Sequence, residues 1–297
     1  MNSQTYIITG PTASGKSDFA HALARKLSGV IINCDSVQLY RGVETIAASP
    51  FAGRPLGPDI DGVPYKLFSI LDLSTQISVG DYLNLARSEY NAATSAGRPV
   101  VFVGGTGFYI NAILNGVSPM PDISDAVRRR AREMVAHDIV AARALLPADF
   151  KFSDAQRVSR GLEVYLQTGR HITEFQAMPR IGAVAPYAKR ILICPPRDVL
   201  RDRIARRAET MLATDALAEG RAILASNWDP RRAIGADQVC KYLRGTVDRD
   251  TAIAEWITRT NQYAKRQRTW FRTQFAADVE LDHVPTDADV GVILEKV

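Results

Sequence analysis

The sequence of 297 residues contains few of the residue types that build disulfide frameworks and metal centres. Its three cysteines (Cys34, Cys194 and Cys240) are far apart and show no CxxC spacing, and its four histidines are equally scattered. An odd number of isolated cysteines does not fit a disulfide scaffold or a structural zinc site. We therefore expect neither in this protein.

Long apolar runs are also missing. No stretch approaches the roughly 18 apolar residues of a membrane helix, and the beginning MNSQTYIITG has neither the basic nor the apolar region of a secretory signal. Apolar residues make up 46% and charged residues 23%, which is typical of a folded globular protein. We expect a soluble, cytoplasmic monomer with no membrane partner. The net charge of +5 is too small to indicate a polyanionic partner until the basic residues are located.

Short apolar, β-branched runs alternate with longer segments of helical spacing. Strands are predicted at Tyr6–Thr9, Val30–Asn33, Lys66–Leu71, Pro99–Val103 and Arg190–Cys194. The run VVFV (100–103) is apolar on both faces, as in a strand buried between two helix layers. Strands that alternate with helices predict βαβ units and a parallel sheet, and hence an α/β fold.

This alternation stops after Asn115. From Ser118 to about Gly182 the sequence shows helical patterns, such as Ala126–His137 and Asp154–Thr168, and no convincing strand. The borders GVSPMP and MPRIGAVAP are rich in proline and glycine, as hinges often are. We predict an all-helical subdomain at residues 118–182, inserted into a catalytic core of residues 1–117 and 183–297.

A phosphate-binding motif follows the first predicted strand. The segment GPTASGKS (10–17) matches G-x4-G-K-[ST] and directly precedes a predicted helix. In such a P-loop, backbone N–H groups and the helix N-terminus bind phosphate oxygens, the lysine reaches the outer phosphate, and the last hydroxyl contacts Mg²⁺. The predicted ligand is a di- or triphosphate on a P-loop NTPase-like core, and the motif does not single out ATP. Its members are Gly10, Pro11, Thr12, Ala13, Ser14, Gly15, Lys16 and Ser17.

Asp35 comes directly after the second predicted strand, at the edge where such sheets bind ligands. It could be a Mg²⁺ ligand, a general base that faces the substrate, or only a cap of the following turn. The segment DSVQLYRG (35–42) is too polar for simple packing. The chain lacks an NKxD guanine-binding motif, and the run VVFV is followed by GGTG (104–107), in which Thr106 offers a hydroxyl but no residue is acidic.

Five motifs together resemble the tRNA dimethylallyltransferase (tRNA isopentenyltransferase) family. They are GPTASGKS (10–17), DSVQLYRG (35–42), GGTGFY (104–109), DAQRVSRGLEVYLQTG (154–169) and YAKRQRTWFR (263–272), in the order of that family. The resemblance implies transfer of a dimethylallyl group from dimethylallyl diphosphate to N6 of the adenosine at tRNA position 37, beside the anticodon. It also implies that the P-loop holds the prenyl diphosphate and not a nucleotide.

The resemblance implies a role for several side chains. Asp35 would accept the N6 proton, while Thr106, Lys16 and Arg207 would act on the diphosphate and Ser17 would contact Mg²⁺. Arg203 lies one helical turn before Arg207. The implied tRNA-binding residues are Asp35, Ser36, Val37, Gln38, Thr106, Arg128, Gln156, Arg157, Arg160, Arg232, Lys265, Arg266, Gln267, Arg268 and Arg272. The sequence departs from the family pattern at Tyr65, where a histidine is usual.

Basic residues concentrate in three places. They outnumber acidic residues in the segments Lys189–Arg207 and Glu255–Arg272, and they recur at Arg128–Arg132. A single run of this kind is usually a solvated helix face. Three runs, one of them (Glu255–Arg272) with interleaved aromatic residues, favour an RNA loop, such as the tRNA anticodon loop. An adenylate isopentenyltransferase that acts on a free nucleotide and a P-loop small-molecule kinase remain as alternatives.

Overall fold

The computed structural model describes residues 4–295. Within this part the contacts divide the chain into two compact units. The core unit comprises the chain up to Leu114 and again from Val184 onward, and the helical unit comprises Asn115–Ala183. Each unit is described by itself.

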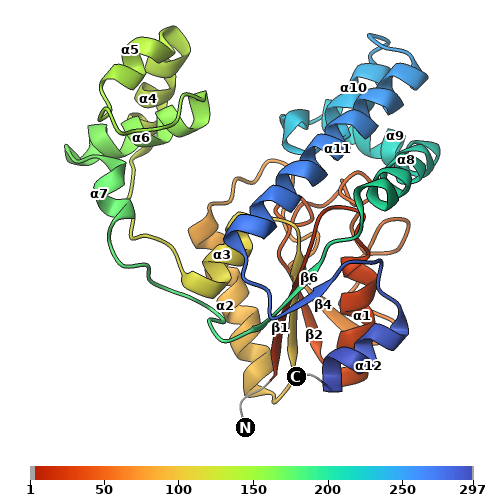
Figure 1. Ribbon diagram of the computed structural model, residues 1–297. Helices are drawn as coiled ribbons and strands as arrows, with labels where there is room; N and C mark the ends of the chain where they lie inside the picture. The colour runs from red at the N-terminus through yellow and green to blue at the C-terminus, as the bar shows by residue number, and fades with distance from the viewer. Residues whose placement is uncertain (1–3, 296–297) are drawn as a thin grey trace. The chain divides into compact units, whose positions relative to one another are not determined.

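The core unit is built on one mainly parallel sheet, which confirms the predicted α/β class (Figure 1). In the described residues the sheet has seven strands in the order β3-β4-β2-β5-β1-β6-β7, and only the β3–β4 pair is antiparallel. The strands are β1 (Thr5–Thr9), β2 (Val30–Asn33), β3 (Asp59–Ile60), β4 (Val63–Lys66), β5 (Val100–Gly104), β6 (Lys189–Ile193) and β7 (Val279–Leu281). All five residues of β5 are buried, as expected of a central strand covered on both faces.

Helices cover both faces of this sheet. Helices α1 (Lys16–Leu27) and α12 (Asp287–Glu295) pack together on one face, and α2 (Val79–Ser95) packs against β2 and β5 on the other (Figure 1). The N-terminus of α2 has a capping box, in which Ser78 and Asp81 bind each other's backbone N–H groups. The remaining helices of the core unit are α3 (Gly107–Asn115), α8 (Arg197–Ala213), α9 (Ala216–Leu224), α10 (Ala236–Leu243) and α11 (Arg249–Gln274), with a 3₁₀ turn at Pro230–Arg232.

One predicted strand is wrong. The chain is extended over Val63–Lys66, and not over Lys66–Leu71. Leu67 and Ser69 take left-handed backbone angles, with φ of 64° and 50°. The N–H groups of Ser69 and Ile70 instead bind the carbonyls of Gln38 and Leu39, so this segment fastens the loop that follows β2.

The helical unit has a hydrophobic core of its own. Its helices are α4 (Asp125–His137), α5 (Ile139–Ala144), α6 (Ala155–Thr168) and α7 (Ile172–Gln176). Their apolar faces meet around Ala131, Leu146 and Leu162. Ser124 caps α4 and Asp154 caps α6 by accepting a backbone N–H three residues ahead. At the border, Val117 and Ile181 pair as an isolated antiparallel bridge.

Candidate active site

The P-loop connects β1 to α1 and has glycine where the backbone requires it. A Cβ atom on Gly10 would lie 2.1 Å from the carbonyl oxygen of Ile193, so no larger residue fits there. Gly15 is the N-cap of α1 and has a φ of 90°, a left-handed angle that costs glycine little. The N–H of Ser14 donates to the carbonyl of Pro11 at 3.2 Å. Apart from the N–H of Thr12, which Gln267 Oε1 accepts at 2.8 Å, the loop presents its remaining N–H groups and the helix N-terminus as an anion site.

Three cationic side chains are fastened to this loop. Lys16 Nζ donates to the carbonyl of Pro11 at 3.4 Å, and Arg203 Nε donates to the carbonyl of Ala13 at 2.8 Å. Arg207 Nη2 donates to Thr12 Oγ1 at 2.6 Å. Among the described residues none of the three cations forms an ion pair. Burial lowers the pKa of Arg207 to about 10, with a further contribution from Arg203. Such an accumulation of unpaired positive charge favours a polyanionic ligand.

The protonation of Lys16 predicts a pH dependence of diphosphate binding. Burial lowers the pKa of Lys16 to about 8, and Arg207 adds to this effect while Asp35 opposes it. Only the protonated amine attracts the ligand, so affinity for a prenyl diphosphate should fall as the pH rises above about 8, approaching tenfold per pH unit. Calorimetric titrations at several pH values measure this. The Lys16→Arg variant keeps its charge and should flatten the profile, whereas an equal slope in both proteins would contradict the role of Lys16.

Asp35 is held by its own loop at the end of β2. Its Oδ1 accepts the N–H of Val37 at 3.0 Å, and its backbone N–H donates to Asn33 Oδ1 at 2.7 Å. Asn33 Nδ2 donates to the carbonyls of Asp35 and Leu67 at 3.0 and 2.9 Å. Within the described residues Asp35 Oδ2 has no hydrogen bond. One carboxylate oxygen is therefore fixed and the other is free to accept a proton.

A buried layer beneath Asp35 keeps this geometry. Tyr82 donates from its hydroxyl to the carbonyl of Asn33 at 2.9 Å, and its ring stacks on Tyr109 with centroids 3.7 Å apart. Burial raises the pKa of Cys34 to about 12, so this thiol stays protonated and is not a nucleophile. The layer has a positioning role.

Two side chains predicted to act on ligands also form hydrogen bonds with the backbone. Thr106 Oγ1 accepts the N–H of Ser36 at 3.0 Å and thus joins the GGTG loop to the Asp35 loop. Gln267 is buried, and its amide accepts from the N–H of Thr12 at 2.8 Å and donates to the carbonyl of Gly105 at 2.9 Å. Gln267 therefore braces the P-loop, and it also lines the cavity beside this loop, so its RNA contact stays a prediction.

A cavity of about 540 Å³ lies between the P-loop and the Asp35 loop. Its lining includes the P-loop residues 12–17, the cations Arg203 and Arg207, and Asp35. The lining also has apolar members, which come from the segment 46–52, from α8 and α11, and from the two residues that follow the 3₁₀ turn. They are Ile46, Ala47, Ala48, Ala52, Ile204, Ala208, Met211, Ala233, Ile234 and Trp256. The sequence does not reveal this wall, because its members are ordinary small or aliphatic residues of separate segments.

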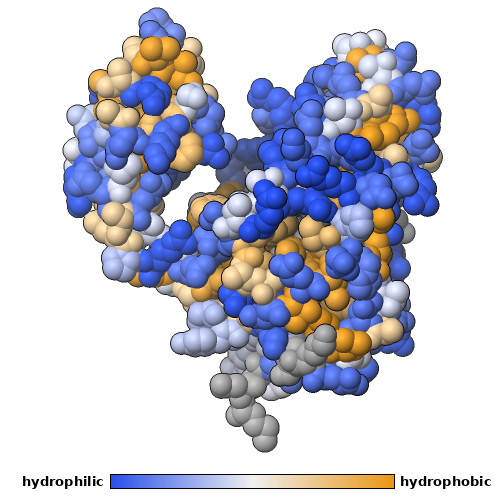
Figure 2. Space-filling model, viewed as in Figure 1, coloured by the Kyte–Doolittle hydropathy of each residue, from blue (hydrophilic) through white to orange (hydrophobic). Residues whose placement is uncertain are grey.

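The core unit places the predicted RNA contacts in two locations. Ser36, Val37, Gln38 and Arg232 line the cavity with Asp35. Apart from Thr106 in the GGTG loop, the other contacts of the core unit are on α11, whose surface is largely hydrophilic (Figure 2). There Lys265, Arg266 and Arg272 are exposed, whereas Arg268 is partly buried and donates to the carbonyl of Pro195. The basic residues of α11 therefore form an accessible positive surface.

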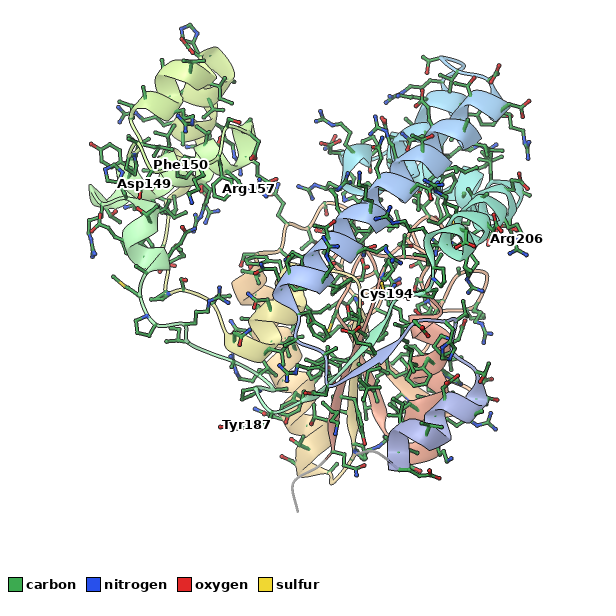
Figure 3. All side chains as sticks on the ribbon, in the orientation of Figure 1. Asp149, Phe150, Arg157, Tyr187, Cys194 and Arg206 are labelled. Carbon is green, nitrogen blue, oxygen red and sulfur yellow. The ribbon has the colours of Figure 1, made fainter. Side chains whose placement is uncertain are left out.

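The helical unit carries the remaining predicted RNA contacts. Gln156 and Arg157, the second of which is labelled in Figure 3, are exposed in the first turn of α6. The guanidinium carbon of Arg157 lies over the ring of Phe152, 4.6 Å from the ring centre. Arg160 pairs with Glu163 at 3.0 Å. Arg128 donates to the carbonyl of Ile123 at 3.2 Å. These arginines are fixed by neighbours of the same unit and keep donors for a ligand.

Protein residues alone do not form a metal centre in the described part of the chain. No group of three or more His, Cys, Asp or Glu side chains there could hold an ion. Ser17 and Asp35 both line the cavity, and hydroxyl and carboxylate oxygens suit Mg²⁺, which commonly takes its other ligands from phosphate and water. The donor set therefore fits a cation that enters with a diphosphate.

Among the described helices none has the length and apolar character of a membrane span.

Comparison with known proteins gives the family. The family model for IPP transferase matches residues 38–274, and the model for isopentenyl transferase matches residues 3–63. The chain is 38% identical to tRNA dimethylallyltransferase of Parvibaculum lavamentivorans, over 91% of this chain and 88% of that protein. It is 39% identical to the enzyme of that name from Sphingopyxis alaskensis, over 90% and 89%.

Solved structures have the same architecture. The tRNA isopentenylpyrophosphate transferase of Bacillus halodurans is 29% identical and superposes with a TM-score of 0.69, covering 99% of this chain and 95% of that one. A eukaryotic dimethylallyltransferase acting on tRNA has a TM-score of 0.78 at 24% identity, with 98% and 78% coverage, and supports the fold. These matches confirm the resemblance seen in the five sequence motifs. The chain belongs to the IPP transferase family.

Proposed function

We propose that this protein transfers a dimethylallyl group from dimethylallyl diphosphate to N6 of the adenosine at position 37 of tRNA. One observation carries the proposal: a single cavity joins a cationic phosphate loop, a carboxylate with a free oxygen and an apolar wall. Each of the three parts matches one requirement of the reaction. Membership of the IPP transferase family supports the same assignment.

The cationic end suits the diphosphate and the apolar wall suits the five-carbon chain. Lys16, Arg203 and Arg207 face the leaving group, which gains charge as the allylic C–O bond breaks. Donors placed where negative charge develops stabilise the transition state. Thr106 is proposed to hold the Asp35 loop in position relative to the diphosphate site, since its hydroxyl accepts the N–H of Ser36.

The adenine amine is a weak nucleophile, because its lone pair is delocalised into the ring. Asp35 compensates for this weakness by acting as a general base. As N6 attacks the allylic carbon, the new C–N bond forms, the C–O bond breaks and diphosphate leaves with the electron pair. The N6 proton passes to Asp35 Oδ2, the oxygen that has no hydrogen bond. General-base assistance of this kind contributes typically ~10²–10⁴-fold.

Mg²⁺ is the proposed cofactor. Ser17 would hold it together with diphosphate oxygens, and the ion would supply charge neutralisation to the leaving group. The chain's own residues orient the loop for this purpose, because α1 begins at Lys16 and thereby places Ser17 in its first turn.

The proposed RNA surfaces are the exposed face of α11 with Lys265, Arg266 and Arg272, and the first turns of α4 and α6 with Arg128, Gln156 and Arg157. Arginine planes and aromatic rings suit the unstacked bases of an anticodon loop. The pair of Arg157 and Phe152 offers both.

An acceptor assay tests this function against its alternatives. Labelled dimethylallyl diphosphate is incubated with the protein and either unmodified tRNA, AMP or ATP. We expect label only in tRNA, and only when adenosine occupies position 37. Label in AMP or ATP would instead identify an adenylate isopentenyltransferase. Transfer of the ATP γ-phosphate to a small molecule, without prenylation, would identify a kinase.

A further inference from the structure

A short turn between β2 and β3 forms one wall of the cavity. In residues 44–49 the N–H groups of Ala47, Ala48 and Ser49 donate to carbonyls three to five residues earlier, and Ala48 has a φ of 50°. This leaves the first N–H groups and the last carbonyls of the turn without partners inside it, as at the ends of any helical turn.

Glu219 of α9 satisfies the first end of the turn. Its Oε1 accepts the N–H of Thr45 at 2.6 Å and its Oε2 accepts the N–H of Ile46 at 2.8 Å, across more than 170 residues of sequence. Burial raises the pKa of Glu219, and the two backbone N–H groups partly offset this effect. A half-buried carboxylate that binds two adjacent N–H groups fixes the turn relative to α9.

Gln38 satisfies the other end. Its Nε2 donates to the carbonyls of Ala47 and Ala48 at 3.1 and 3.0 Å. Gln38 also belongs to the Asp35 loop, so this contact joins the turn to the loop that carries the base. Both ends of the turn are thus fastened by side chains from elsewhere.

The fastened turn points its apolar side chains into the cavity. Ile46 is only 5% exposed and shares the cavity lining with Ile204, Ala208 and Met211 of α8. The turn forms one side of this apolar space and α8 forms the other. Because α8 packs against α9, Glu219 of α9 connects the two sides. The distance between the two sides decides how long an apolar chain fits.

We infer that Glu219 is a positioning residue that sets the width of the apolar end of the cavity and thereby selects the five-carbon chain over longer prenyl chains. The identity of that chain rests on the proposed function. Glu219 lies away from the reacting atoms and acts through the turn.

The test uses the full chain and binding measurements that do not require turnover. Dissociation constants are measured for inorganic diphosphate and for the unreactive S-thiolodiphosphates of dimethylallyl and geranyl alcohol. In the Glu219→Gln variant the amide offers one acceptor and turns a donor toward the turn. We expect affinity for the dimethylallyl analogue to fall about tenfold, and its advantage over the geranyl analogue to shrink, with inorganic diphosphate unchanged.

Glu209→Gln is the matched control, because Glu209 is exposed on α8 and its loss removes the same charge. The inference is overturned if Glu219→Gln changes all three constants by one factor, or behaves as the control does. Ile46→Ala shortens the apolar wall that Glu219 positions, and it leaves the two hydrogen bonds of Glu219 to the backbone intact. This variant therefore tests the chain-length preference of the wall if Glu219→Gln fails to fold. It should favour the geranyl analogue, and an unaltered preference would refute the inference. Absence of prenyl transfer to tRNA by the unmodified protein would count against the proposed function alone.

Discussion

Replacement of Asp35 by asparagine is expected to lower the rate of prenyl transfer to tRNA by about 10²–10⁴-fold. Asparagine has nearly the same shape, and its Oδ1 can still accept the N–H of Val37. The hydrogen bonds of Asn33 reach the backbone of residue 35 and do not depend on its side chain. What the variant loses is the carboxylate oxygen that takes the N6 proton in the proposed reaction.

Single-turnover rates measure this loss, with donor and tRNA affinities determined separately. Both affinities should stay close to those of the unmodified protein, since the carboxylate acts when the proton moves. Asp250→Asn is the control, because Asp250 has a side chain that is 94% exposed and lies at the start of α11. A rate within a few-fold of the unmodified protein would exclude Asp35 as the base. It would leave the carboxylate as a cap of its turn.

The parts of the site that follow from local sequence patterns were predictable. The P-loop glycines, Lys16 and Asp35 lie next to strands whose apolar character fixes their place in the sheet. The carboxyl ends of parallel strands meet at one edge, so residues that follow β1 and β2 come together there. Arg203 and Arg207 reach the loop because a separation of four residues places them on one face of α8.

The short edge elements were not predictable in the same way. β3 and β7 have two and three residues, too few for a period-two pattern to emerge. The apolar run after Lys66 resembles a strand, yet Leu67 and Ser69 adopt left-handed angles, and the N–H groups of Ser69 and Ile70 bind the loop after β2. A tertiary contact overrides local preference at this point.

Side chains that act over long sequence separations leave no local signal at all. Gln267 stands between arginines in an apparent RNA-binding stretch, and only the fold shows that it faces inward toward Thr12 and Gly105. Glu219 resembles any charged residue of an amphipathic helix until the turn at Thr45 is seen beside it. Burial, and not residue type, distinguishes such positions.

Replacement of Arg207 by alanine is the second change with a large expected effect, about 10²–10³-fold in the transfer rate. In the proposed reaction its guanidinium stabilises the leaving diphosphate, and it donates to Thr12 Oγ1 at 2.6 Å, so its loss removes charge and loosens the loop. Arg207→Lys should recover only part of the rate, since lysine keeps the charge without the planar fork that binds two oxygens together.

The neighbouring Arg206 provides a matched control. It is exposed on α8 and donates to the carbonyl of Asp202, within its own helix (Figure 3). Arg206→Ala removes the same charge one residue away and should leave the rate and the diphosphate affinity unchanged. If the alanine variants at 206 and 207 lose equal activity, the general positive potential of α8 is responsible, and not the position of Arg207. A loss confined to Arg207→Ala, with weaker binding of inorganic diphosphate, places the leaving group at this guanidinium.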